Sequence, residues 1–267
     1  MSEVGEWGET KYSLVAHYCE MFATGMKNRW DYRVYLDLFS GPGRVRFRRT
    51  RAIHNSTPML ALLASEPFDL YVFNDANCEW IDALKQRAGK AAPDARKLFF
   101  CGDADEIARD AIGGIEELRG SDSALTFCVL DPPDISSLSF ATIRTISKVF
   151  VDFLVLIASG MDAQRNWRLY ESPDNPTMDR FLGRSDWREE WEKPEVRRDG
   201  FGPFVMAAFT ESMRHEDFSR GLLETVRLPE NNTPLYYLAG FSRHPLGIKF
   251  WERVHRSLHP QRFLPLD

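Results

Sequence analysis

Short apolar runs alternate with stretches of helical periodicity through the first 160 residues of the chain. Apolar side chains spaced three or four positions apart predict a first helix over residues 10–26, with Thr10 as its cap. Five apolar runs followed by turn residues predict strands at residues 35–39, 70–75, 97–101, 125–130 and 152–158. Helical stretches separate these runs, and Thr57-Pro58 is predicted to start the second helix with Thr57 as its cap. This alternation predicts an α/β fold with a parallel, doubly wound sheet covered by helices on both faces.

The pattern changes after the fifth strand. Residues 160–200 are rich in Trp, Arg, Asp and Pro and have poor periodicity, which predicts an insert of loops and short helices. The segments that follow predict a helix and then an antiparallel hairpin, at residues 204–213, 222–228 and 235–242, before a last amphipathic helix. Five parallel strands closed by such a hairpin are typical of the Rossmann-like fold of class I methyltransferases. We therefore expect a single domain over residues 1–267, with the region at about 160–220 as a cap or specificity region.

Composition favours a folded and soluble protein. Hydrophobic residues make up 43% of the chain, and the formal net charge of −5 argues against a wholly basic nucleic-acid binder. The sequence has no apolar run of transmembrane length and no secretory N-terminus, so we expect a cytoplasmic protein without membrane partners. The four cysteines, Cys19, Cys78, Cys101 and Cys128, include no Cys-x-x-Cys pair. We expect reduced thiols, with neither a zinc site nor a disulfide.

A glycine-rich turn follows the first predicted strand directly. Gly41 and Gly43 lack a Cβ, so the backbone N–H groups of the turn can approach a ligand, and Asp37 can accept hydrogen bonds from an ammonium or hydroxyl group. The turn has neither the third glycine of the dinucleotide fingerprint nor a P-loop Gly-Lys-Ser/Thr element. We expect Asp37, Ser40, Gly41 and Gly43 to hold the amino-acid part of S-adenosylmethionine. The alternative is a turn that only connects two elements.

Four successive strands are predicted to end in a carboxylate, at Asp37, Asp75, Asp103 and Asp131. Ligands of doubly wound sheets bind outside the carboxyl ends of the strands. Asn74 and Asp75 are therefore predicted to receive the ribose hydroxyls of the cofactor. The adenine amino group is predicted to face Gly102, Asp103 and Ala104. Helix capping is the competing interpretation for Asp75 and Asp103.

The sequence Asp131-Pro132-Pro133-Asp134 is the candidate for the reaction itself. Amino methyltransferases that act on DNA carry an Asp/Asn-Pro-Pro-aromatic motif at this place, whose polar groups accept hydrogen bonds from the target amine of a flipped base. We expect Asp131 and the carbonyl of Pro132 to orient the acceptor, and Asp134 to act as a base. Asp134 stands where the motif has its stacking aromatic ring. The alternative is a pair of prolines that only ends a strand.

A basic run, residues 44–51, follows the glycine turn. The planar fork of arginine matches phosphate oxygens, so a phosphate-bearing substrate is predicted to bind Arg44, Arg46, Arg48 and Arg49 at the rim of the site. The alternative is a solvated loop or an edge strand.

Several motifs together resemble the three-Cys-motif partner proteins, called TcmP. The turn Asp37-Leu-Phe-Ser-Gly-Pro-Gly43 is similar to the Asp-Leu-Phe-Ala-Gly-Pro-Gly of that family. Further similarities lie at residues 180–183, 186–188, 234–238 and 242–247. The family usually has Asp-Pro-Tyr-Gly where this chain has Asp131-Pro-Pro-Asp134. The resemblance implies a methyltransferase-like fold and a separate partner protein, similar to radical-SAM enzymes, that carries the three cysteines.

Three functions remain open from the sequence. The first is an S-adenosylmethionine-dependent methyltransferase whose acceptor is a nucleic acid or a nucleotide. The second is a non-catalytic, cofactor-binding partner or regulator of a three-Cys-motif protein, which the altered residue Asp134 favours. The third and weakest is a nuclease or hydrolase that holds a divalent metal with the same carboxylates.

Overall fold

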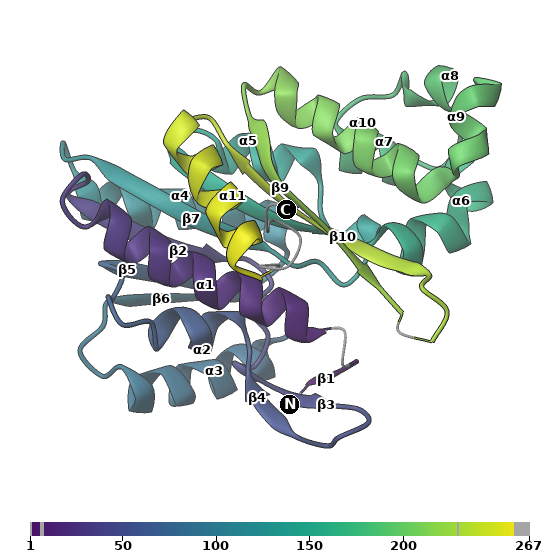
Figure 1. Ribbon diagram of the computed structural model, residues 1–267. Helices are drawn as coiled ribbons and strands as arrows, with labels where there is room; N and C mark the ends of the chain where they lie inside the picture. The colour runs from purple at the N-terminus through teal and green to yellow at the C-terminus, as the bar shows by residue number, and fades with distance from the viewer. Residues whose placement is uncertain (1, 6–7, 229, 259–267) are drawn as a thin grey trace, which may run out of the picture.

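A seven-stranded sheet forms the centre of the computed structural model, which describes residues 2–5, 8–228 and 230–258 (Figure 1). Its strands, in spatial order, are β6 (Lys97–Cys101), β5 (Leu70–Asp75), β2 (Tyr32–Asp37), β7 (Ala124–Leu130), β8 (Phe150–Ile157), β10 (Pro234–Ser242) and β9 (Ser219–Arg227). The first five are parallel, and β10 runs antiparallel to both of its neighbours. The predicted α/β fold, with a mostly parallel sheet closed by an antiparallel hairpin, is confirmed.

The strands are buried because helices cover both faces, which explains why they appear in the sequence as continuous apolar runs. From β2 the chain adds β5 and β6 on one side and then returns to add β7 and β8 on the other side. Because such connections are right-handed, the helices that link the first group of strands and those that link the second group lie on opposite faces of the sheet. Figure 1 shows α1 and α11 in front of the sheet. The helices that connect the parallel strands of the sheet are α2 (Thr57–Leu62), α3 (Cys78–Ala91), α4 (Ala104–Arg119) and α5 (Phe140–Ile146), while α1 (Gly8–Met26) precedes the sheet and α11 (Pro245–Leu258) follows it in the chain.

An aromatic contact joins the first and last helices. The rings of Tyr18 on α1 and Trp251 on α11 stack with their centroids 3.6 Å apart, and both side chains are fully buried. A Cβ at Gly240 of β10 would lie 2.4 Å from the Trp251 ring, so this strand position needs glycine. The C-terminal helix is thereby packed into the same core as the N-terminal helix.

A second, three-stranded sheet lies beside the N-terminus of α1. Its order is β1 (Ser2–Val4), β3 (Arg44–Phe47) and β4 (Ile53–Asn55), with β1 parallel to β3 and β4 antiparallel to it. Val45 and Phe47 are buried against Tyr12, whereas Arg44 and Arg48 are exposed. The basic run is therefore a β-strand and the turn after it, with its arginines on the outer side.

The insert after β8 is largely helical. It contains the π-helical turn η2 (Ser159–Ala163), α6 (Gln164–Glu171), α7 (Thr177–Leu182), α8 (Trp187–Trp191), α9 (Pro194–Asp199) and α10 (Phe201–His215). Trp187, Trp191, Phe201 and Phe204 form its buried aromatic cluster. These aromatic residues explain the Trp-rich composition as a local core.

The structure corrects three local predictions. Cys78 and Cys101 form a disulfide, which contradicts the expectation of reduced thiols; the end of β6 and the start of α3 meet beside β5, with the two Cα atoms 5.3 Å apart. The first helix begins at Gly8 rather than after Thr10. Ser56 precedes α2 as its cap residue, because the hydroxyl of Thr57 donates a hydrogen bond to Asp37 instead. Within the described residues, we find no helix long and apolar enough to cross a membrane.

Candidate functional site

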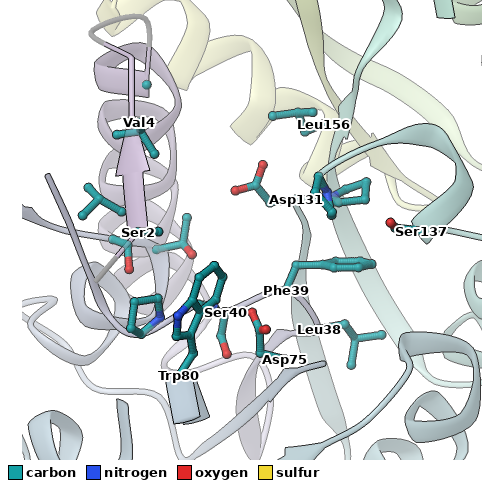
Figure 2. A pocket seen from close by; sticks show the side chains of 18 of the residues that line it. Ser2, Val4, Leu38, Phe39, Ser40, Asp75, Trp80, Asp131, Ser137 and Leu156 are labelled. Atoms are coloured by element: carbon teal, nitrogen blue, oxygen red, sulfur yellow. Dashed lines mark hydrogen bonds between the residues drawn. The ribbon is translucent and has the colours of Figure 1, made fainter. Parts of the chain in front are cut away.

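A cavity of about 520 Å³ opens at the carboxyl ends of β2, β5, β6 and β7 (Figure 2). We call it the strand-end pocket. Its walls are formed by the glycine turn after β2, by the carboxyl ends of β5, β6 and β7, by strand β1 and by the first turn of α1. Leu156 of β8 and Tyr236 of β10 close its far side. The pocket thus lies at the switch point of the sheet, where ligands of such folds bind.

Asp37 lies below the pocket floor and does not line it. Its carboxylate is fully buried and accepts hydrogen bonds from the Thr57 hydroxyl (2.6 Å), the Tyr35 hydroxyl (3.2 Å) and the Phe39 N–H (3.1 Å). In the sheet, Asp37 lies opposite Phe73 of β5 and Val129 of β7. Phe73 precedes Asp75 by two residues and Val129 precedes Asp131 by two residues, so Asp37 lies deeper in the sheet than these two carboxylates. Burial raises the pKa of Asp37 to about 7. Its position suits a residue that holds the turn.

The two glycines of the turn have different roles. Gly41 lines the pocket with φ of +60°, and a Cβ added there would meet nothing within 4 Å. Gly43 has φ of +80° and faces away from the pocket, where a Cβ would lie 2.8 Å from Leu84 and 3.0 Å from Met59. Gly43 is therefore required by helix packing rather than by close approach of a ligand, unlike the sequence-based expectation. Ser40 lines the pocket and donates its hydroxyl to the carbonyl of Asn74 (2.9 Å).

Asp75 faces the pocket at the end of β5. Its two carboxylate oxygens accept hydrogen bonds from the N–H groups of Gly41 (2.8 Å) and Asn77 (2.9 Å). Burial raises its pKa, and these two backbone donors lower it in part. Asn77, rather than Asp75, provides the side-chain cap of α3. A carboxylate can accept about four hydrogen bonds, so Asp75 retains acceptor capacity on its pocket side.

Asn74 and the loop after β6 form the adjoining wall. The amide nitrogen of Asn74 donates to the carbonyls of Leu38 (3.1 Å) and Gly102 (3.0 Å). Asp103 caps α4 by accepting from the N–H of Asp105, and it also lines the pocket together with Gly102 and Ala104. Capping and pocket lining therefore coexist at Asp103.

A buried ion pair occupies the opposite end of the pocket. The ammonium of Lys11 on α1 lies 2.5 Å from the carboxylate of Asp131, and the two side chains are only 11% and 19% exposed. Burial raises the pKa of Asp131, and Lys11 lowers it in part. Burial has the largest single effect on the pKa of Lys11 and lowers it, but the Asp131 carboxylate together with Tyr12 and Tyr236 raises the net pKa. The ion pair thus favours the protonated ammonium of Lys11 and offsets part of the effect of burial on Asp131.

Asp134 is turned away from this ion pair. Its carboxylate accepts hydrogen bonds from the hydroxyls of Ser136 (2.7 Å) and Ser137 (2.9 Å) and caps the short helix η1 (Ile135–Ser137). It does not line the pocket, although Pro132 and Pro133 do. Burial alone would raise the pKa of Asp134, but these hydrogen bonds lower it overall. A carboxylate so placed is a poor base for a group bound in the pocket.

The predicted phosphate-binding arginines are only partly brought together. Arg48 lines the strand-end pocket and is exposed. Arg44 lies on a separate, smaller hollow beside α3, while Arg46 is half-buried and Arg49 is exposed. The alternation of β3 therefore distributes these side chains over more than one surface.

Lys11, Trp80 and Tyr236 are among the lining residues that were not singled out from the sequence. Lys11 lies one helical turn before Val15, on the buried face of α1, and a lysine on an apolar helix face was the available signal. The indole of Trp80 stands on the Asp75 side of the pocket in Figure 2. The N-terminal strand β1 gave no signal, because three residues are too few to show a period. Among the described residues, no group of three or more His, Cys, Asp or Glu side chains is arranged to hold a metal ion.

Comparison with known proteins gives structural neighbours only. No family model matches the chain, and no curated protein sequence matches it. The protein LPL1258 from Legionella pneumophila, described with family-model DUF519, is similar over 93% of both chains, with a TM-score of 0.53 and 11% identity. Trm1 from Pyrococcus horikoshii, solved with S-adenosyl-L-methionine, is similar over 91% of this chain and 57% of its own, with a TM-score of 0.47 and 11% identity. A putative RNA methyltransferase, PH1948 from the same organism, is similar over 85% and 83%, with a TM-score of 0.40 and 13% identity. The strand order is that of a Rossmann-like α/β fold closed by an antiparallel hairpin, and the first likeness shows that the chain shares its fold with a solved protein.

Proposed function

We propose that the chain is an S-adenosylmethionine-dependent methyltransferase that acts on an amino group of a nucleic acid or nucleotide. The observation that carries this proposal is the strand-end pocket, which has Asp75 at one end and the Lys11–Asp131 ion pair at the other. A pocket of about 520 Å³ lies within the range of small-molecule sites. The cofactor would bind at the Asp75 end, and the reacting group of the acceptor would be oriented at the Lys11–Asp131 end.

The residues at the Asp75 end fit an adenosyl group. Among the described residues, the buried side-chain oxygen of Asn74 has no hydrogen-bond partner, although Asn74 lines the pocket. Asp75 would accept hydrogen bonds from the two ribose hydroxyls, because its backbone donors leave part of its acceptor capacity unused. Asp103 would accept from the adenine amino group, and Ser40 and Gly41 would contact the amino-acid part. The bound cofactor would supply an already activated methyl group.

The residues at the other end fit an acceptor amine. Asp131 would accept a hydrogen bond from the amine and, as a charged group in a largely buried site, would stabilise the positive charge that develops on the nitrogen. Lys11 would favour the ionised form of that carboxylate and fix it in place. Figure 2 shows the ring of Phe39 to the side of Asp75 and Asp131, where it could pack on a planar base in place of the aromatic residue that Asp134 replaces. Catalysis would then consist mainly of positioning.

The basic strand supports a phosphate-bearing acceptor. Arg48 is exposed at the pocket, and its guanidinium can pair with phosphate oxygens of a nucleotide whose base enters the pocket. Arg44 and Arg46 of β3, and Arg49 after it, would contact neighbouring phosphates outside it. This arrangement favours a nucleic acid over a small neutral acceptor.

Methyl transfer from radiolabelled S-adenosylmethionine to RNA, DNA and nucleotides tests the proposal. We expect transfer to one of these classes by the wild type and by Asp110→Asn, a control at an exposed position of α4. We expect Asp131→Asn, with its fold checked by circular dichroism, to lose most of the activity. Unchanged transfer by Asp131→Asn would refute the role of Asp131.

A second candidate is a cofactor-binding partner of a three-Cys-motif protein that transfers no methyl group. The engagement of Asp134 in capping η1, and the absence of an aromatic side chain at that position, favour it. Cofactor binding without transfer to any of the acceptors, together with specific capture of a three-Cys-motif protein, would support this candidate. The four strand-end carboxylates each have different partners within the described residues, which disfavours a shared divalent metal ion and with it the metal-dependent hydrolase.

A further inference from the structure

The disulfide Cys78–Cys101 lies beside the part of the pocket that faces the adenosyl group. Cys101 is the last residue of β6 and the register partner of Asp75 in the sheet. Cys78 is the first residue of α3, three positions after Asp75. The bond therefore links two segments, residues 74–80 and 101–104, that together provide seven lining residues: Asn74, Asp75, Ala76, Trp80, Gly102, Asp103 and Ala104.

The β5–β6 ladder ends at the register pair Asp75–Cys101, and further hydrogen bonds join these two segments beyond it. The N–H of Gly102 donates to the carbonyl of Asp75 at 3.3 Å, and the Asn74 amide donates to the carbonyl of Gly102 at 3.0 Å. The disulfide is the covalent link between them. The spacing between Asp75 and Asp103, and thus the fit to ribose and adenine at once, depends on how firmly the segments are joined.

Both cysteines of the bond are exposed, whereas the two free cysteines are not. Cys78 at the start of α3 and Cys101 at the end of β6 both have exposed side chains. Cys19 and Cys128 are fully buried, and burial raises the pKa of both thiols, so they are inert in the folded chain. An external thiol can thus reach the disulfide selectively, and exposed disulfides are commonly the labile or regulatory ones.

We propose that Cys78 and Cys101 form a redox-responsive clamp that sets the affinity of the strand-end pocket for its adenosyl ligand; this inference rests on the proposed function. A dithiol reductant would open the clamp by two exchanges. A thiolate of the dithiol attacks one cysteine sulfur, forms a mixed disulfide and releases the other cysteine as a thiolate. The second thiolate of the dithiol then displaces the remaining cysteine, so the dithiol becomes a disulfide and the two cysteine thiolates take up two protons.

The open clamp binds its ligand more weakly for an entropic reason. With the covalent link removed, the two segments sample more arrangements, and ligand binding has to order them again. We expect the affinity for S-adenosylhomocysteine to fall about fivefold to tenfold on reduction, since only a short segment gains freedom. The acceptor end, with Lys11 and Asp131, lies on other elements and keeps its structure.

Calorimetric titration with S-adenosylhomocysteine of the oxidised and the dithiothreitol-reduced protein tests the inference. Iodoacetamide labelling followed by mass spectrometry reports the state of Cys78 and Cys101 independently of any ligand. The variant Cys78→Ser/Cys101→Ser provides the permanently open form, and circular dichroism checks its fold. Should that variant not fold, the comparison of oxidised with reduced wild type still decides the question.

The expected result is weaker binding after reduction, recovery on reoxidation, and a serine variant that resembles the reduced form and ignores dithiothreitol. Equal or tighter binding by the reduced protein would overturn the clamp while leaving the proposed function intact. Labelling of both cysteines in the air-oxidised protein would also overturn it. No binding by either form would refute the proposed function, and the clamp with it.

Discussion

Replacing Lys11 with methionine removes one partner of the buried ion pair while retaining most of the side-chain volume. The ammonium and the Asp131 carboxylate are 2.5 Å apart and mostly buried. With an effective dielectric constant of about 20, their attraction is about 7 kcal/mol before desolvation is subtracted. Removing one member of a buried pair typically costs about 3–5 kcal/mol, because the other charge stays buried without compensation. We therefore expect Lys11→Met to lower the free energy of unfolding by about 3–5 kcal/mol at neutral pH.

Urea denaturation at pH 7 measures this change, and the chain offers a matched control. Lys27 forms an ion pair with Glu66 at 2.8 Å, but its side chain is 52% exposed. Lys27→Met should therefore change the free energy of unfolding by about 1 kcal/mol or less. The double variant Lys11→Met/Asp131→Asn should recover part of the loss, because it leaves no buried charge. Equal effects of Lys11→Met and Lys27→Met would refute the reasoning.

Three further predictions concern the turn, the buried carboxylate and the basic strand. Gly43→Val should destabilise the protein by about 2 kcal/mol or more, since its φ of +80° and the nearby Leu84 side chain both oppose a Cβ; thermal unfolding measures this, and an unchanged melting temperature would contradict it. The pKa of Asp37 is raised from 3.8 to about 7, so the folded state binds more protons between these values and the free energy of unfolding falls as the pH rises from about 4 to about 7. Asp37→Asn should flatten that pH dependence in urea titrations, and an unaltered slope would show that another group is responsible. Arg48→Ala should weaken binding of single-stranded RNA and reduce its salt dependence by about one phosphate contact, whereas Arg253→Ala on the exposed face of α11 should not; equal fluorescence-anisotropy titrations would exclude Arg48 from the interface.

The parallel sheet could be predicted because strands buried on both faces form continuous apolar runs. The strands at residues 70–75 and 97–101 have the predicted bounds, and the other predicted strands differ by only a few residues at their ends. The closing hairpin could be predicted because two apolar runs flank a polar turn. Pairings that depend on the fold gave no such signal, among them β1 with β3 and the disulfide across 23 residues.

The four strand-end carboxylates show where sequence reasoning about the site ends. Asp75, Asp103 and Asp131 line one pocket, as the rule for doubly wound sheets suggests. Asp37 follows the same sequence pattern but lies two residues deeper in register than Asp75, about 6–7 Å along the strand. The sequence does not contain the register, so it treats all four as equivalent. The sequence likewise gave no sign that Lys11 pairs with Asp131, because Lys11 lies 120 residues earlier in the chain.

The insert after β8 illustrates a prediction that the structure leaves open. Its helical nature follows from the loss of strand periodicity, and its aromatic residues form a local core. None of the described residues between 160 and 220 lines the strand-end pocket. A role of the insert in capping the site or selecting the substrate therefore stays a prediction.

Calorimetric titration with S-adenosylmethionine tests the central claim, that the strand-end pocket binds this cofactor, most directly. The account predicts binding by the wild type and by Asp82→Ala, an exposed control on α3, and at least about tenfold weaker binding by Asp75→Ala, because a charge-assisted pair of hydrogen bonds is lost. Failure of the folded wild type to bind S-adenosylmethionine, or equal binding by Asp75→Ala and Asp82→Ala, would contradict it.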